Sequence, residues 1–278
     1  MMEKLANTFE LLKACWNVLR KDREILWLPV MSGFSVLVVL ASFIAPAILV
    51  GDPGAMRRAF NEDRDTFMLM VFGFYFLNYL IIFFFNSAIV ACATIRMKGG
   101  DPTLYDGLSI ASDRIFHIFM WALISSTLGM VLRMIQEKSN LLGRVLGGLV
   151  GVAWSLASYL LIPVLVNENK GPFDAFLDSA ELLKKTWGES ILGNMSFGLI
   201  FTIASLPACL AVFAGAVLDK AFILPLFVVA VAYLLALSVF QSALQGIFQA
   251  ALYLFARFGN VPAGFREEQL RHAIKRRI

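Results

Sequence analysis

Charged residues are scarce in this sequence. Asp, Glu, Lys and Arg make up 16% of its 278 residues, and 59% of the residues are hydrophobic. Soluble domains average about 25% charged and about 45–50% apolar residues. A soluble core cannot bury this much apolar surface, so the composition excludes an ordinary soluble domain and favours a membrane protein.

Cysteine and histidine are rare as well, with three cysteines and two histidines. Cys15, Cys92 and Cys209 are too scattered for a disulfide framework, and together with His117 and His272 they form no cluster with metal-ligand spacing. Serine hydrolase and phosphate-loop signatures are also missing. The sequence therefore predicts neither a metal nor another cofactor.

Long uncharged stretches hold most of the apolar residues. Residues 26–50, 66–95, 115–132, 145–167, 191–218 and 221–256 contain no Asp, Glu, Lys or Arg. About 20 apolar residues suffice to cross a bilayer as a helix, so these stretches predict about six transmembrane helices. The segment before the first stretch does not resemble a cleaved signal peptide, and we expect the first span to act as an uncleaved anchor.

Lys and Arg are distributed unevenly between the alternate loops. One predicted side holds 17 of them, including both termini, and the other side holds 7. Cytoplasmic loops are enriched in Lys and Arg, so we expect a multi-pass protein of the cell membrane with both termini in the cytoplasm. The net charge of +4 arises from this enrichment, so we expect anionic lipids at the cytoplasmic face, and no nucleic acid, as partners.

The chain also repeats itself. Residues 10–16 read Glu-Leu-Leu-Lys-x-x-Trp, and residues 181–187 have the same pattern. Turns containing Gly and Pro follow the second, fourth and sixth stretches, at residues 98–102, 170–172 and 259–262. An amphipathic segment follows each turn. Proline is tolerated in the first turn of a helix, so each turn can also be the start of the next helix.

These patterns predict an all-α membrane bundle of three pseudo-repeated hairpins, each preceded by a cytoplasmic interfacial helix. The repeats cover approximately residues 1–97, 98–169 and 170–257, and residues 258–278 form a basic C-terminal interfacial helix. With the Leu-Leu-Lys-x-x-Trp element and the hairpin repeats, the chain resembles an uncharacterised family of prokaryotic six-span membrane proteins. More distantly, it resembles the membrane domain fused to some glycerophosphodiester phosphodiesterases. The resemblance implies an architecture and no activity.

A polar face on the sixth span is one candidate site. Gln241, Gln245 and Gln249 recur at every fourth residue and therefore share one face of the helix. They could line a polar pathway or ligand pocket with Asn78, Asn86 and Asn194, or they could form hydrogen bonds between helices. We favour the second interpretation, because the spans lack the ionisable groups that usually mark a transport path.

His117 is the other candidate, since Asp113 precedes it by one helical turn. Alignment of Pro102 with Pro172 places His117 on Trp187, which, like Trp16, is expected at the membrane boundary. We therefore favour an interfacial role for His117. Asp101, Asp106, Asp113 and His117 remain the clustered titratable residues that an enzyme acting on lipid headgroups would use.

Small residues form a ridge on the fourth span, where Gly143, Gly147, Gly151 and Ser155 recur at every fourth residue and allow another helix to approach closely. Pro163 and Pro207 are expected to kink their spans.

The function that we rank first is a non-enzymatic scaffold or accessory protein whose basic cytoplasmic helices contact anionic lipids or a protein partner. The basic C-terminal tail of the chain would add four cations to this cytoplasmic face: Arg271, Lys275, Arg276 and Arg277. A transporter or channel for a small polar or lipid-like solute is the alternative, and a lipid-headgroup enzyme is the third hypothesis.

Overall fold

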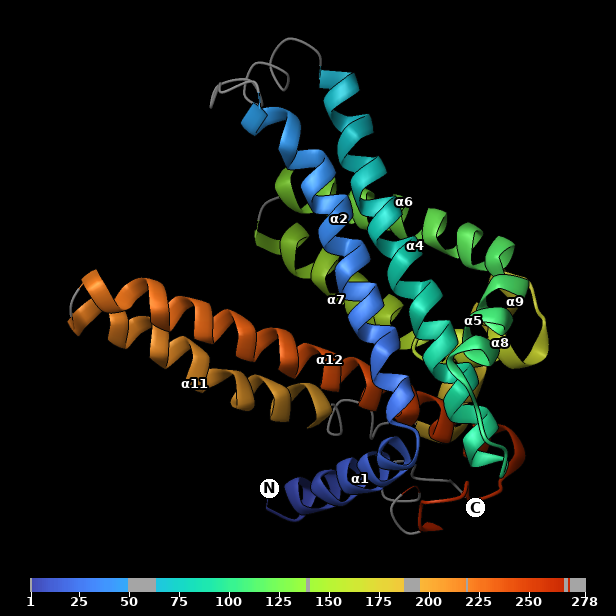
Figure 1. The fold of residues 1–278 in the computed structure, drawn as a ribbon. Coiled ribbons are helices and arrows are strands. Elements are labelled where there is room, and N and C mark those ends of the chain that lie inside the picture. Colours follow the sequence, from blue (N-terminus) through green and yellow to red (C-terminus); the bar gives the residue numbers. More distant parts are fainter. Residues whose placement is uncertain are drawn as a thin grey trace. The chain divides into compact units, whose positions relative to one another are not determined.

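The chain folds as an all-α polytopic helical bundle (Figure 1). The structure is a computed structural model, and it describes residues 2–49, 64–138, 141–187, 196–218, 220–267 and 270. Its elements are α1 (Met2–Lys21), the short 3₁₀ helix η1 (Arg23–Leu26), α2 (Trp27–Leu49), α4 (Arg64–Met97), α5 (Leu104–Asp113), α6 (Ile115–Lys138), α7 (Leu141–Ala157), α8 (Leu161–Glu168), α9 (Pro172–Trp187), α11 (Ser196–Leu218) and α12 (Lys220–Phe258).

Five candidate membrane spans lie in the described residues, and their ranges are Arg23–Ala45, Asp65–Met97, Ile115–Gln136, Gly143–Glu168 and Ile223–Phe258. A shorter apolar helix covers Ile200–Gly215. These ranges match the six uncharged stretches of the sequence, with the fifth stretch represented by the shorter helix. The chain is therefore an integral membrane protein.

The chain forms two compact units, which we describe separately. The first unit comprises Met1–Pro29, Cys92–Leu104 and Leu182–Ile278. The second unit comprises Val30–Ala91 and Tyr105–Glu181.

In the first unit α11 and α12 lie side by side, and α1 packs against both of them (Figure 1). Leu11, Cys15, Val18 and Leu19 of α1 are buried, and their spacing places them on one helical face. The apolar face expected to lie in the headgroup region is thus covered by protein. Phe9 and Trp16 on α1 remain exposed, by 69% and 43%.

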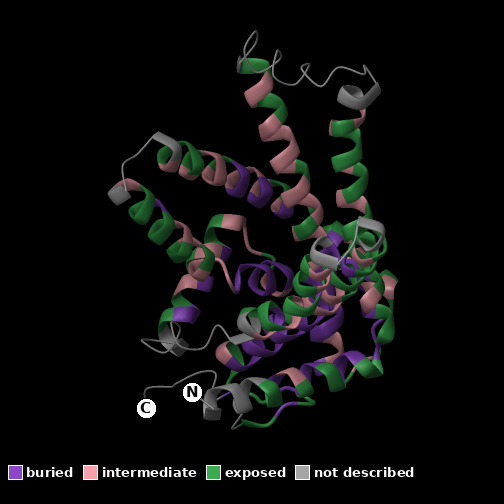
Figure 2. Cartoon of the chain, turned by 90° about the vertical axis from the view of Figure 1, so that its left-hand side faces the viewer, coloured by how far each residue is buried: buried purple, intermediate pink, exposed green. Residues whose placement is uncertain are grey.

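The sixth span is one unbroken helix, because α12 continues through Gly246 for 39 residues. At 1.5 Å per residue it is about 58 Å long, nearly twice a hydrocarbon core of about 30 Å. Large apolar side chains are exposed between Ile223 and Leu235, whereas residues 246–255 are all buried. Figure 2 shows the same contrast elsewhere, with buried residues gathered in limited stretches and long helical stretches left exposed or intermediate.

In the second unit aromatic contacts connect the helices. Phe43 of α2 meets Phe74 of α4 edge to face, with ring centroids 5.3 Å apart. Phe76 of α4 meets Phe119 of α6 at 5.1 Å in the same way. The packing of this unit therefore depends on ring contacts between helices as well as on aliphatic side chains.

The fourth span is broken between α7 and α8, at residues 158–160. Pro163 accounts for the break, because proline lacks an N–H group and its ring clashes with the carbonyl of residue i−4, here Tyr159. The backbone N–H of Leu160 instead donates to Ser179 Oγ on α9, at 3.0 Å. The kink predicted at Pro163 is therefore a break stabilised by a neighbouring helix. Pro207, in contrast, lies inside α11, which continues through it as one helix.

A residue in the left-handed region lies in or directly before each Gly/Pro turn: Gly99 (φ 91°), Asn169 (φ 52°) and Gly259 (φ 71°). After α4, Gly99 N–H donates to Arg96 O and Gly100 N–H donates to Ile95 O. This pair of bonds is the Schellman termination of a helix, which favours glycine because a Cβ atom destabilises the left-handed conformation. The turns between the spans thus follow from local sequence.

Candidate functional site

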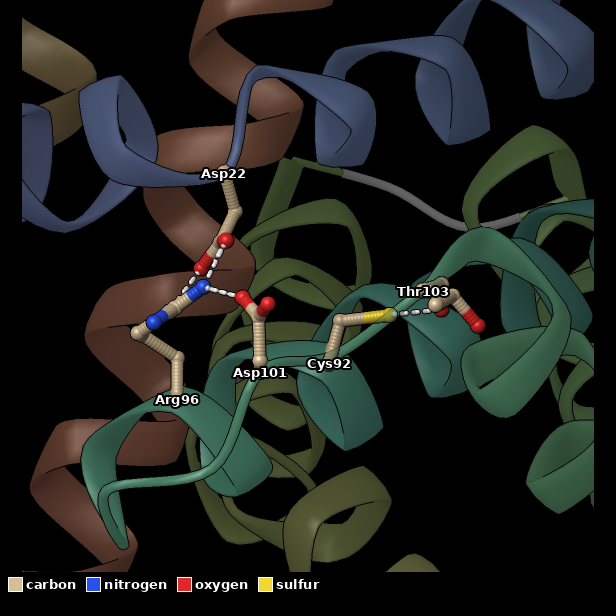
Figure 3. A network of polar contacts seen from close by, with 5 residues as sticks. All are labelled: Asp22, Cys92, Arg96, Asp101 and Thr103. Carbon is tan, nitrogen blue, oxygen red and sulfur yellow. Dashed lines mark hydrogen bonds and ion pairs between the residues drawn. The ribbon is translucent and has the colours of Figure 1, made fainter.

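A partly buried ion pair joins the start of η1 to the end of α4 in the first unit (Figure 3). Arg96 donates from Nε and Nη2 to the two carboxylate oxygens of Asp22, and Nη2 also donates to Asp101 Oδ1. The side chain of Asp22 is 6% exposed and that of Asp101 is 91% exposed. The buried carboxylate therefore holds the guanidinium in a two-pronged bond, and the exposed one adds little because water screens it.

The loop between Arg96 and α5 is held by further local contacts. Gly100 allows the chain to pass Ile95, because a Cβ atom at this position would lie 2.7 Å from Ile95 Cγ2. Cys92 Sγ lies 3.5 Å from the carbonyl oxygen of Thr103, to which it donates (Figure 3). These contacts fix the loop that presents Asp101.

A second ion cluster follows α8 in the second unit. Lys170 Nζ donates to Asp178 Oδ2 and lies 3.0 Å from Glu168 Oε2. The hydrogen bond that Lys170 donates to Asp178, followed by the one it donates to Glu168, raises the pKa of Lys170 above its ordinary value, because both carboxylates stabilise the charged amine.

Arg114, between α5 and α6, has a different environment. Its Nη1 donates to the side-chain oxygen of Asn169, the left-handed residue that follows α8. Among the described residues no carboxylate pairs with Arg114, and its Nε is buried without a hydrogen-bond partner.

The structure gives the three glutamines of α12 different environments. Gln241 is partly buried, Gln245 is exposed and Gln249 is buried. Just before them Phe240 contacts Trp16 of α1, with ring centroids 5.8 Å apart. The glutamine face therefore starts at the level of α1, beyond the exposed apolar stretch of α12. Glutamines at this position can be accommodated without a polar path through the hydrocarbon.

The structure describes two of the three predicted asparagine partners, Asn78 and Asn86. Asn78 Nδ2 donates to Phe74 O of its own helix at 2.7 Å. Asn78 and Asn86 belong to the second unit, whereas the glutamines belong to the first. Asn194 lies outside the described residues, as do Arg271, Lys275, Arg276 and Arg277 of the basic tail.

The titratable residues expected near His117 are divided between the units. Asp101 belongs to the first unit, and Asp106, Asp113 and His117 belong to the second. His117 is partly buried, its ring contacts Phe116 edge to face, and its Nδ1 has no hydrogen-bond partner among the described residues. Trp187 ends α9, and its side chain lies outside the described part. No group of three or more potential metal ligands occurs in the part of the chain that the structure describes.

The small-residue ridge of α7 faces α6 at two positions. A Cβ atom at Gly147 would lie 3.0 Å from Gln136 Cγ, and one at Gly151 would lie 3.9 Å from Leu132 Cδ1. Gly143 is partly buried and Ser155 is exposed. Gly147 and Gly151 thus serve packing inside one hairpin.

Sequence analysis missed a stack of three aromatic rings in the second unit. Trp121 of α6 lies parallel to Trp154 of α7 at 5.1 Å, and Phe176 of α9 lies 4.7 Å from Trp154. The stack connects the second hairpin to the helix after it. None of the three rings belongs to the repeated Leu-Leu-Lys-x-x-Trp element that the sequence showed.

One protein family matches the chain over residues 65–264, and its description reads "family of unknown function (DUF6159)". No curated protein and no solved structure matches the chain. The expectation of an uncharacterised family is thereby confirmed, and the similarity to phosphodiesterase membrane domains stays a prediction.

Proposed function

The chain belongs to this family of unknown function, whose match covers most of its length, and we propose that it is a non-enzymatic membrane scaffold or accessory protein. In this proposal the helices that precede the spans form a basic, cytoplasmic, membrane-contacting face in the cell membrane. The observation that carries the proposal is that these helices are apolar on two sides, one buried and one exposed.

Helix α9 is the clearer example. Ala175, Leu182 and Leu183 are buried, whereas Phe173 and Leu177, one turn apart, are each 64% exposed. Lys184, on the same helix, is also exposed. A helix of a soluble surface has no need for the two exposed apolar side chains, but a helix at the headgroup boundary inserts them among the acyl chains.

Helix α1 has the same two-sided character. Its buried face packs on α11 and α12, and it leaves Phe9 and Trp16 exposed beside the exposed cations Lys13 and Arg20. Tryptophan favours the membrane boundary because its ring is apolar and its N–H group is polar. Lys and Arg attract anionic headgroups by about 1 kcal/mol each near the surface. Together these residues support a face that contacts anionic lipid.

The test uses the full chain in a mild detergent, with bound phosphatidylglycerol counted by native mass spectrometry. Changing Lys13, Arg20 and Lys184 together to Gln should lower the number of retained lipids. Changing Arg57, Arg58 and Arg144, which the charge distribution places on the opposite side, should not. Equal retention by both triple variants would contradict the proposal.

The transport hypothesis gains no support from the described glutamines. Gln249 lies in the stretch of α12, residues 246–255, in which every residue is buried, and Gln245 is exposed near the level of α1. A transporter would need these side chains to face one continuous polar path. We therefore rank the scaffold first.

A further inference from the structure

Arg114 occupies a fixed position at the junction of α5 and α6. Its backbone N–H donates to Ala111 O at 3.1 Å, and its carbonyl accepts from Ile118 N–H at 3.0 Å. The side chain is partly buried and is held at Nη1 by Asn169. The guanidinium is therefore positioned by both backbone and side-chain bonds.

The charge of this guanidinium is not neutralised within the described residues. Arg96 binds Asp22 and Asp101, and Lys170 binds Glu168 and Asp178. Arg114, in contrast, binds a neutral amide oxygen, and its buried Nε has no partner. A partly buried cation without an anion is unfavourable, so this site is suited to an anionic ligand.

His117 lies three residues after Arg114, in the first turn of α6, which the hydrogen bond from Ile118 N–H to Arg114 O begins. Its Nδ1 is also buried without a hydrogen-bond partner in the described structure. Two nitrogen atoms that lack partners therefore occur one turn apart. A guanidinium provides a planar fork of donors, which fits two oxygens of one phosphate group.

The surroundings of this pair indicate where the phosphate comes from. Ile115 and Phe116, which follow Arg114 directly, are exposed by 45% and 69%. Exposed aromatic and aliphatic side chains beside a cation are typical of the membrane boundary, where phosphate groups of lipids are concentrated. Asp113, the neighbouring carboxylate, is exposed to solvent.

We propose that Arg114 and His117 bind one phosphate group, supplied by the headgroup of an anionic phospholipid. The proposal rests on the proposed function, because it assigns a specific lipid site to the membrane-contacting face. Arg114 binds two phosphate oxygens, His117 Nδ1–H donates to the same group, and Asn169 orients the guanidinium.

The first experiment measures the affinity of the full chain for phosphatidylglycerol by native mass spectrometry in detergent. Arg114→Gln should weaken binding of the first lipid about tenfold, which corresponds to about 1.4 kcal/mol, because the variant loses charge-assisted hydrogen bonds to the phosphate. Arg144→Gln is the matched control, because Arg144 is exposed on α7, and it should leave the affinity unchanged. Equal affinity for the Arg114 variant and the wild type would overturn the proposal.

A second variant keeps the fold intact. Asn169→Asp places a carboxylate beside Nη1 of Arg114, and aspartate tolerates the left-handed backbone at this position. The internal ion pair should then compete with the phosphate, so lipid affinity should fall while the melting temperature stays equal or rises. A stable variant with unchanged lipid affinity would overturn the proposal independently of Arg114→Gln.

Inorganic phosphate distinguishes the two sources of the group. If the headgroup is the ligand, millimolar phosphate should leave the affinity for phosphatidylglycerol unchanged and should not raise the melting temperature of lipid-free protein. An Arg114-dependent rise in melting temperature with phosphate alone would overturn the lipid assignment in favour of free phosphate. One result would reject this site and leave the proposed function standing. In that result the triple variant of Lys13, Arg20 and Lys184 retains fewer lipids, whereas Arg114→Gln binds lipid as the wild type does.

Discussion

Asp22 is nearly buried, and its partner Arg96 is more accessible, with side-chain exposures of 6% and 22%. Removing the carboxylate leaves a partly buried guanidinium with only the exposed Asp101. We expect Asp22→Ala to lower the free energy of unfolding by about 3 kcal/mol. Asp101→Ala, its control, should cost less than about 1 kcal/mol, because its carboxylate is solvated. Thermal unfolding in detergent checks both, and equal effects would contradict this division of roles.

Ser179 accepts the N–H group that the break in the fourth span leaves without a helical partner. Ser179→Ala should destabilise the protein by about 1–3 kcal/mol, because the buried amide then has no acceptor. Ser35→Ala provides the comparison, because Ser35 Oγ only donates to Met31 O of its own helix, and its removal leaves no backbone amide without an acceptor. If both variants unfold at the same temperature, Ser179 does not stabilise the break.

Lys170 gives the stability a pH dependence at its alkaline end. Its pKa is raised in the folded state by Asp178 and Glu168, so its stabilising contribution is complete below the unfolded value of about 10.4 and declines as pH rises through the folded value. The destabilisation by Lys170→Gln should therefore be constant from pH 7 to pH 9 and shrink above about pH 10.4. Denaturant unfolding of both proteins across this range measures the difference. If the difference in unfolding free energy between the two proteins increased with pH, the expected direction of this effect would be wrong.

The pairs at this scale could not be read from the sequence. Asp22 and Arg96 are 74 residues apart, and Arg114 and Asn169 are 55 apart. No helical spacing connects such residues, and their contact depends on how the helices fold back. Sequence did identify His117 as a residue to consider, but not the neighbouring Arg114, which pairs with no carboxylate among the described residues.

At the scale of elements, the spans were largely predictable. Residues 26–50 and 221–256 correspond to α2 (Trp27–Leu49) and α12 (Lys220–Phe258), because the absence of charge directly marks what a bilayer tolerates. Pro163 indicated the break in the fourth span, but not how the freed amide of Leu160 is satisfied. Its acceptor, Ser179, lies on another helix.

The contact between α6 and α7 offers a test of helix packing. Gly147 faces Gln136, whereas a Cβ atom at the adjacent Gly148 would meet nothing within 4 Å. Gly147→Leu should therefore cost about 1–3 kcal/mol through overpacking, and Gly148→Leu should be neutral or slightly stabilising because leucine favours the helix. Thermal unfolding compares the two variants. A stable Gly147→Leu would show that α7 does not pack on α6 through this ridge.

At the scale of the whole molecule, the sequence correctly predicted that the helices before the spans are amphipathic. It did not predict what their apolar faces pack against. Periodicity shows that Leu11, Cys15 and Leu19 share a face of the helix. It does not show whether lipid or protein covers that face. In the structure α1 packs against α11 and α12. The remaining exposed side chains, such as Phe9 and Trp16, are the ones available to lipid.

The lipid-exposed length of the helices has a further consequence. Helix α12 is about 58 Å long, and a hydrocarbon core is about 30 Å thick, so a bilayer holds little more than half of this helix at a small tilt. Large exposed apolar side chains lie between Ile223 and Leu235, whereas residues 246–255 are buried, so we expect the exposed stretch to be the part inside the hydrocarbon. A mismatch between this stretch and the bilayer costs a fraction of a kcal/mol per Å, so the melting temperature in liposomes of graded acyl-chain length should have a maximum at one thickness. A cell with membranes of unequal thickness would then concentrate the protein in the bilayer of that thickness.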